Sequence, residues 1–77
     1  MSTFLTKITT YINQGEQIKA EHPEIWKSKY DDDLENLRKI LNKASINESA
    51  AQHIFNLTEI SKSQTFGNYI QKQDVSA

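Results

Sequence analysis

The sequence predicts an all-α fold: a small three-helix bundle, followed by either a short fourth helix or a tail. One proline and two glycines in 77 residues leave few places where a helix must break. Apolar residues recur at every third or fourth position rather than at every second one, which is the helical period. Because a chain of this length holds one small domain at most, we expect a single domain over residues 1–77.

The first helix is predicted over residues 3–21, with Ser2 placed to cap its start. Its apolar positions fall on one side of the helical wheel: Phe4, Leu5, Ile8, Tyr11, Ile12 and Ile18. Gly15 lies on the same stripe, where it lowers helix propensity by about 1 kcal/mol relative to alanine but lets another helix approach closely. A local break at Gly15 is the alternative. Pro23 ends the helix, since proline lacks the backbone N–H that an inner turn needs.

The second helix is predicted over residues 23–44, with Pro23 in its first turn. Its apolar positions keep one phase throughout: Trp26, Tyr30, Leu34, Leu37, Leu41 and Ala44, with Ile40 beside them. That phase favours one continuous helix. Against it, the acidic run Asp31–Asp33 precedes the basic residues Arg38 and Lys39, and this order suits the dipole of a helix that begins near residue 31. A kink near residues 29–31 is therefore the alternative.

The third helix is predicted over residues 46–62, because Ser45 and Glu48 have the spacing of a capping box. Its apolar residues spread over more than half of the helical wheel, which is wider than one bundle face requires. A short helix or tail is predicted over residues 64–73. We expect the three main helices to be antiparallel in sequence order and to pack on this core: Phe4, Leu5, Ile8, Ile12, Leu34, Leu37, Leu41, Ile54 and Leu57.

Charge and composition exclude several classes of function. Nine basic and ten acidic residues give a net charge of −1, with no basic stripe that could displace counterions from phosphates, so nucleic acid is disfavoured as a partner. No apolar run approaches the roughly 18 residues of a membrane span. The first fifteen residues are amphipathic rather than a charged start followed by an apolar signal core, so we expect a cytoplasmic protein.

No motif for catalysis, a cofactor or a metal is found. The chain has no cysteine, which removes thiolate chemistry and zinc–thiolate sites. The acidic run Asp31–Asp33 lacks the central glycine of a calcium loop, and Asn42 stands where its bidentate glutamate belongs. His22 and His53 are far apart and have no companion at metal-ligand spacing. We therefore expect no enzyme activity, no cofactor and no metal.

What remains is an apolar surplus, and it favours a non-catalytic regulator of the inhibitor, immunity or adaptor type that docks a helical face on another protein. Aromatic side chains with a charged rim have the composition of a binding hot spot. The expected surface consists of Trp26, Tyr30, Asp31, Asp32, Asp33, Phe55, Phe66 and Tyr69. Its acidic part predicts a partner with a basic surface. Against this, aromatics at helical spacing are more often core residues.

Two alternatives come from other functional classes. Residues 34–57 coarsely resemble a helix-turn-helix, which predicts a DNA-binding module, although the second helix carries no Lys or Arg before Lys62. The wide apolar arc of the third helix also fits a homodimer that serves as a structural or scaffold protein.

Overall fold

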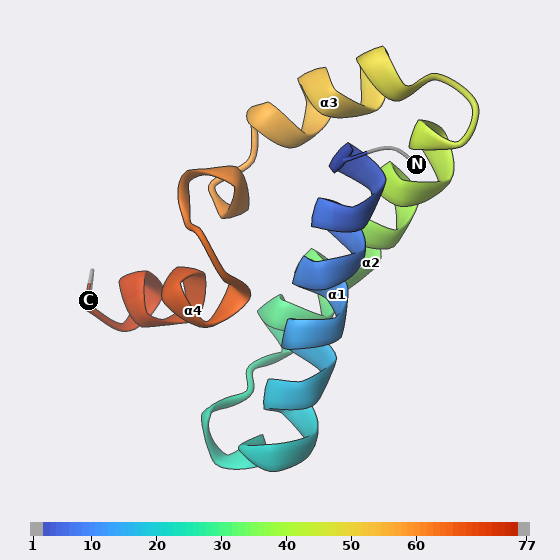
Figure 1. Cartoon of the computed structure of the whole chain (residues 1–77). Helices are drawn as coiled ribbons and strands as arrows, with labels where there is room; N and C mark the ends of the chain where they lie inside the picture. Colours follow the sequence, from blue (N-terminus) through green and yellow to red (C-terminus); the bar gives the residue numbers. More distant parts are fainter. Residues whose placement is uncertain (1–2, 76–77) are drawn as a thin grey trace.

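The computed structural model describes residues 3–75, and for 74 and 75 the backbone alone. Within this range the chain forms four α-helices and two short 3-10 helices: α1 (Thr3–Glu21), η1 (Pro23–Ile25), α2 (Ser28–Ala44), α3 (Glu48–Asn56), η2 (Ile60–Lys62) and α4 (Phe66–Val75) (Figure 1). The predicted all-α fold and its short fourth helix are confirmed. The predicted cap at Ser2 lies outside the described residues.

Helices α1 and α2 form an antiparallel pair, and the other two helices pack against it. Figure 1 shows α3 running across one end of the pair, rather than antiparallel to α2 as predicted, and α4 lying beside α1. Gly15 is buried where α1 faces Leu34 of α2. The close helix approach expected at Gly15 is therefore confirmed, and α1 continues through this position without a break.

The predicted continuous helix over residues 23–44 is wrong. Pro23 opens the short helix η1, Trp26 has an extended backbone, and α2 begins only at Ser28. The break thus lies just before the kink predicted near residues 29–31. It has a packing reason, since it lets the Trp26 indole stack on Phe66 of α4, with ring centroids 5.9 Å apart and planes inclined by 18°.

The start of α3 is capped by Asn47 and not by Ser45. The Asn47 side chain accepts a hydrogen bond from the backbone N–H of Ala50 at 3.1 Å. Ser45 instead donates its hydroxyl to the carbonyl of Asn42, which belongs to the end of α2. The predicted capping box is therefore wrong, and the helix begins at Glu48, two residues later than predicted.

Helix α3 ends at Asn56 instead of residue 62, because side-chain hydroxyls form a turn there. Thr58 donates its hydroxyl to the carbonyl of Phe55 at 2.7 Å and accepts from the N–H of Ser61 at 3.2 Å. Such local bonds compete with helical backbone bonds. The short helix turns Ala51 and Phe55 into the core and leaves Ile54 and Leu57 exposed, so the last two were wrongly predicted as core residues.

Helix α4 is capped by Thr65, whose hydroxyl accepts from the N–H of Asn68 at 3.0 Å, and by Gln14 of α1, whose side-chain oxygen Oε1 accepts from the N–H of Phe66 at 3.2 Å. The helix completes one core: Phe4, Ile8, Tyr11, Ile12, Tyr30, Leu34, Leu37, Ile40, Ala44, Ala51, Phe55, Ile60, Phe66, Tyr69 and Ile70. Leu5 and Leu41, predicted as core residues, are partly buried against it.

Candidate functional site

Four of the eight residues predicted for the docking surface lie in the core instead. The Tyr30, Phe55, Phe66 and Tyr69 side chains are all buried. Each one has an aromatic neighbour within the chain: Tyr30 meets Tyr69 edge-on at 6.3 Å, for example, and Phe55 meets Phe4 at 5.8 Å. The core interpretation of these aromatics is therefore the correct one: α4 folds back and packs Phe66 and Tyr69 against Trp26 and Tyr30, whereas Phe55 of α3 packs against Phe4 and Tyr11 of α1.

Asp31, also predicted to face a partner, is used within the chain. Its Oδ1 atom accepts from Nζ of Lys19 at 2.7 Å and from Nε1 of the half-buried Trp26 at 3.0 Å. The hydrogen bonds from Lys19 and Trp26 hold the pKa of the Asp31 carboxyl below its usual range. The Asp31 carboxylate thus links α2 to Lys19 of α1 and to Trp26 in the connection between the two helices.

Asp33 is engaged as well. Its Oδ2 atom accepts a hydrogen bond from the Tyr69 hydroxyl at 2.7 Å, which ties α4 to α2. Burial and this carboxylate raise the pKa of Tyr69 well above its usual range. Asp32 is exposed and makes no hydrogen bond or ion pair with the described residues. Of the predicted acidic cluster, Asp32 alone keeps a carboxylate without such a partner.

A groove between α2 and α3 is a site that the sequence analysis missed. This open cavity of about 290 Å³ is lined by Asn36, Lys39, Ile40, Lys43, Ile54 and Thr58. Ile40 and Ile54 are its large apolar lining residues, and Lys39 and Lys43, which also line it, are one helical turn apart on α2. Neither lysine has an ion pair with a described carboxylate.

The end of α3 extends this groove with an exposed apolar side chain. Leu57 is 73% exposed and follows Ile54, itself 40% exposed, by three positions, so the two are neighbours on the surface. We define the α3 face as Ile54 and Leu57 together with Lys39 and Lys43. The wide apolar arc in the sequence predicted that this helix has more apolar residues than the core can cover, but it did not predict which of them would be exposed.

Two further large aliphatic residues are exposed away from this face. Ile46 is 87% exposed in the connection before α3. Ile25 is 42% exposed on η1, which lies at the opposite end of the molecule from α3 (Figure 1). Since Ile25 matches Ile54 in type and exposure, it provides a control position for tests of the α3 face.

Among the side chains of residues 3–73, no three of His, Asp or Glu gather as a metal site would require. His22 and His53 are both exposed. None of the helices in this part of the chain is long and apolar enough to cross a bilayer.

Comparisons with protein-family models, curated proteins and solved structures find no match to this chain. Its function therefore has to be inferred from the geometry of its own residues.

Proposed function

We propose that this chain is a non-catalytic protein-binding regulator that docks through the α3 face. The observation that carries the proposal is the exposure of Ile54 and Leu57 beside an apolar groove, although Ala51 and Phe55 already close the core beneath α3. Single exposed aliphatic residues are common, whereas two adjacent ones, one of which lines an apolar groove, are typical of an interaction site. A partner that covered them would remove this apolar area from water.

The charges of the face define the chemistry of the partner. Lys39 and Lys43 line the groove together with Ile40 and Ile54 and have no ion pair with a described carboxylate, so an acidic segment would complement them. An amphipathic helix fits such a groove, with apolar anchors three or four positions apart and acidic residues beside them. The basic partner expected from the sequence has less support, because Asp31 and Asp33 are bonded within the chain.

We propose that the chain binds this partner in the cytoplasm. The sequence contains no cysteine, so the fold needs no disulfide bond and no oxidising compartment in which to form one.

The test is affinity capture with four forms of the full chain, compared by quantitative mass spectrometry. The forms are the wild type, Ile54→Glu, the double variant Lys39→Glu with Lys43→Glu, and the control Ile25→Glu. Circular dichroism first establishes that all four have the same helicity. We expect one protein to be retained by the wild type and the control, and its capture to fall at least tenfold with the other two.

Two results would contradict the proposal. Equal capture by all four forms would show that the α3 face is not used. Light scattering that gives a dimer for the wild type and a monomer for Ile54→Glu would instead assign the face to self-association.

A further inference from the structure

Helix α4 occupies a surface that aromatic rings before and within α2 help to form. Phe66 stacks on Trp26 with ring centroids 5.9 Å apart, and Tyr69 meets Tyr30 edge-on at 6.3 Å. Figure 1 shows α4 at the edge of the molecule, joined to η2 by one stretch of extended chain. Since every copy of the chain carries the same α4, the α4 of a second copy would fit this surface with the same contacts.

Hydrogen bonds from the two long helices hold α4 in place. The Gln14 side chain of α1 accepts from the N–H of Phe66 at 3.2 Å, and the Tyr69 hydroxyl donates to the Asp33 carboxylate of α2 at 2.7 Å. Both bonds join α4 to elements that are far from it in the sequence. They can therefore form whether α4 comes from the same copy of the chain or from another.

Ser63, which connects η2 to α4, is a polar residue that the packed chain leaves unsatisfied. Its backbone is extended, with φ −109° and ψ 147°. The residue is only 5% exposed, yet its Oγ atom has no hydrogen-bond partner among the described residues. A buried hydroxyl without a partner destabilises the packed arrangement, and movement of α4 would return this hydroxyl to water. Ser63 therefore lowers the free-energy cost of moving α4.

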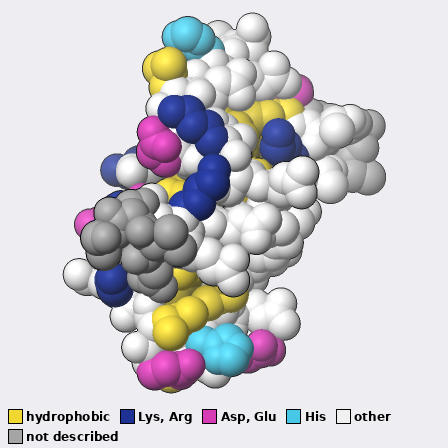
Figure 2. All heavy atoms as spheres, turned by 90° about the vertical axis from the view of Figure 1, so that its left-hand side faces the viewer, with side chains coloured by type: hydrophobic (Ala, Val, Ile, Leu, Met, Phe, Trp, Pro, Cys, Tyr) yellow, Lys and Arg dark blue, Asp and Glu magenta, His cyan; other side chains and the backbone are white. Residues whose placement is uncertain are grey.

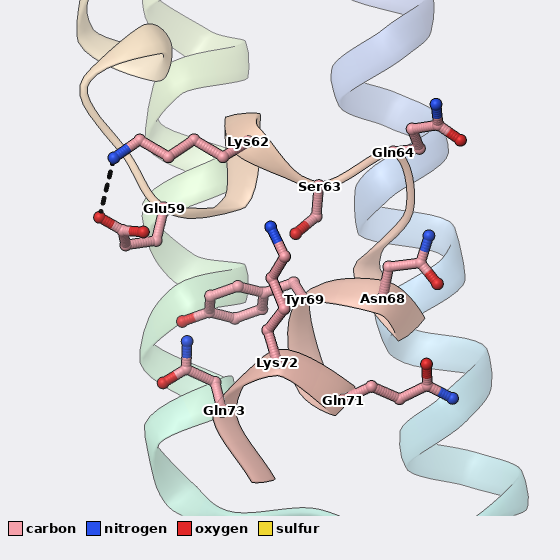
Figure 3. A pocket seen from close by; sticks show the side chains of 9 residues that line it. All are labelled: Glu59, Lys62, Ser63, Gln64, Asn68, Tyr69, Gln71, Lys72 and Gln73. Atoms are coloured by element: carbon pink, nitrogen blue, oxygen red, sulfur yellow. Dashed lines mark hydrogen bonds and ion pairs between the residues drawn. The ribbon is translucent and has the colours of Figure 1, made fainter. Parts of the chain in front are cut away.

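A cavity of about 680 Å³ lies between η2 and α4, beside this connection. Figure 3 shows the Ser63 hydroxyl directed into the cavity. Most of the side chains that line it are polar, and they come from both elements. Because the space between η2 and α4 is open here, moving α4 breaks fewer packing contacts than separating a filled interface would.

Helix α4 is also weak as an isolated helix. It has ten residues, fewer than the roughly 12–15 that an isolated helix needs in water. Gly67 in its first turn lowers its helix propensity further. Once opened, α4 therefore regains its helical structure only by docking, either on its own copy or on another one.

Part of the receiving surface is exposed even while α4 is docked. Trp26 is only partly buried, and its neighbour Ile25 is 42% exposed. Figure 2 shows hydrophobic side chains on this side of the molecule, toward the end where η1 lies. A second copy can therefore reach the surface before α4 has left it completely.

We propose that α4 opens as one unit about Ser63 and is exchanged between two copies of the chain, so that Phe66 of each copy stacks on Trp26 of the other. The partner of this aromatic surface is thus a second copy. The exchanged dimer does not use the α3 face, so it is independent of the function proposed above.

Hydrogen exchange of the ¹⁵N-labelled full chain, followed by NMR, tests the opening. We expect the amides of α4 to exchange together, with protection factors roughly tenfold or more below those of the buried turns of α1 and α2. Ser63→Ala removes the unpartnered hydroxyl and should raise the protection of α4 roughly fivefold or more. The control Ser49→Ala, at an exposed position of α3, should leave it unchanged. Equal protection of α4 and the long helices, or no effect of Ser63→Ala, would overturn the opening.

The exchange is tested by refolding a mixture of ¹³C-labelled and unlabelled full chain from urea at high protein concentration. We expect light scattering to give a dimer, and isotope-filtered NMR to show contacts between Trp26 of one copy and Phe66 of the other. Ile54→Glu, which changes the α3 face, should form the same dimer. A chain that stays monomeric, a dimer without these contacts, or a dimer that Ile54→Glu abolishes would each overturn the exchange.

Discussion

Gly15 and Leu34 are in such close contact that a Cβ atom on residue 15 would lie 2.6 Å from Cδ2 of Leu34. The same Cβ atom would lie 3.4 Å from the ring of Phe66. This one position therefore sets how closely α1 approaches α2, and it leaves room for α4 on the other side.

Replacing Gly15 with alanine should destabilise the protein. Alanine raises helix propensity by about 1 kcal/mol, but the displaced Leu34 is buried in a filled core, where overpacking costs about 1–3 kcal/mol. We expect a net loss of about 1 kcal/mol in the free energy of unfolding, measured by urea denaturation. The matched control is Gly67→Ala, whose Cβ atom meets its nearest neighbours at an ordinary 3.7 Å and which should be neutral or stabilising. Equal effects of the two substitutions would contradict the close-contact explanation.

The cap of α3 gives a second prediction. Asn47→Ala should lower the free energy of unfolding by about 1 kcal/mol, because it leaves the N–H of Ala50 without its side-chain acceptor. Ser45→Ala should change it by less than about 0.5 kcal/mol, since this exposed hydroxyl bonds only a carbonyl at the end of α2. Thermal unfolding of the two variants decides between the caps: a larger loss with Ser45→Ala would restore the capping box predicted from the sequence.

Stability should decrease in alkaline solution. Burial, helped by the hydrogen bond to Asp33, raises the pKa of Tyr69 above its ordinary value of 10.0. Above pH 10 the unfolded chain therefore loses a proton that the folded chain keeps, and the free energy of unfolding falls by up to about 1.4 kcal/mol per pH unit for this group. Burial also raises the pKa of Tyr11, which adds to the same trend.

Tyr69→Phe checks this assignment. The variant should lose about 1–2 kcal/mol at pH 7, where the bond to Asp33 is intact in the wild type. It should also show a shallower loss of stability between pH 10 and 11, measured by urea denaturation at each pH. A slope identical to that of the wild type would show that Tyr69 does not contribute.

The fluorescence of Trp26, the one tryptophan of the sequence, should report the protonation of Asp31. The bonds from Lys19 and Trp26 lower the pKa of Asp31 below its ordinary value of 3.8, so the stabilising contribution of this carboxylate is present above that pH and is lost as the pH falls below it. We expect the fluorescence change of the folded protein to have its midpoint below pH 3.8. Lys19→Gln should move the midpoint upward, and Asp32→Asn should leave it in place. A midpoint unaffected by Lys19→Gln would contradict the network.

The apolar period located the helices in the sequence, but it did not locate all of their ends. The apolar period and Pro23 defined α1 from Thr3 to Glu21 as predicted. The end of α3 was missed because the hydroxyls of Thr58 and Ser61 compete with the backbone, a local effect that the apolar period does not report. The signal for that turn was present in the residue types themselves.

The candidate sites were less accessible to sequence reasoning. The aromatic residues Phe66 and Tyr69 were read as surface because their burial depends on α4 folding back onto Trp26 and Tyr30. Lys39 and Lys43 could not be identified as site residues from the sequence, because they form a groove only together with Ile54 of another helix. The sequence did not distinguish the buried Ser63 from its partly buried neighbours Ser61 and Thr65.

The sequence by itself determined the all-α class and the first helix, because helical periodicity and proline act within a few residues along the chain. The tertiary structure alone decided which apolar residues are covered, which carboxylates of the run Asp31–Asp33 accept hydrogen bonds, and where the groove between α2 and α3 opens. Those outcomes depend on contacts between residues far apart in the sequence, such as Tyr69 with Asp33, whose side chains meet only after the helices have packed.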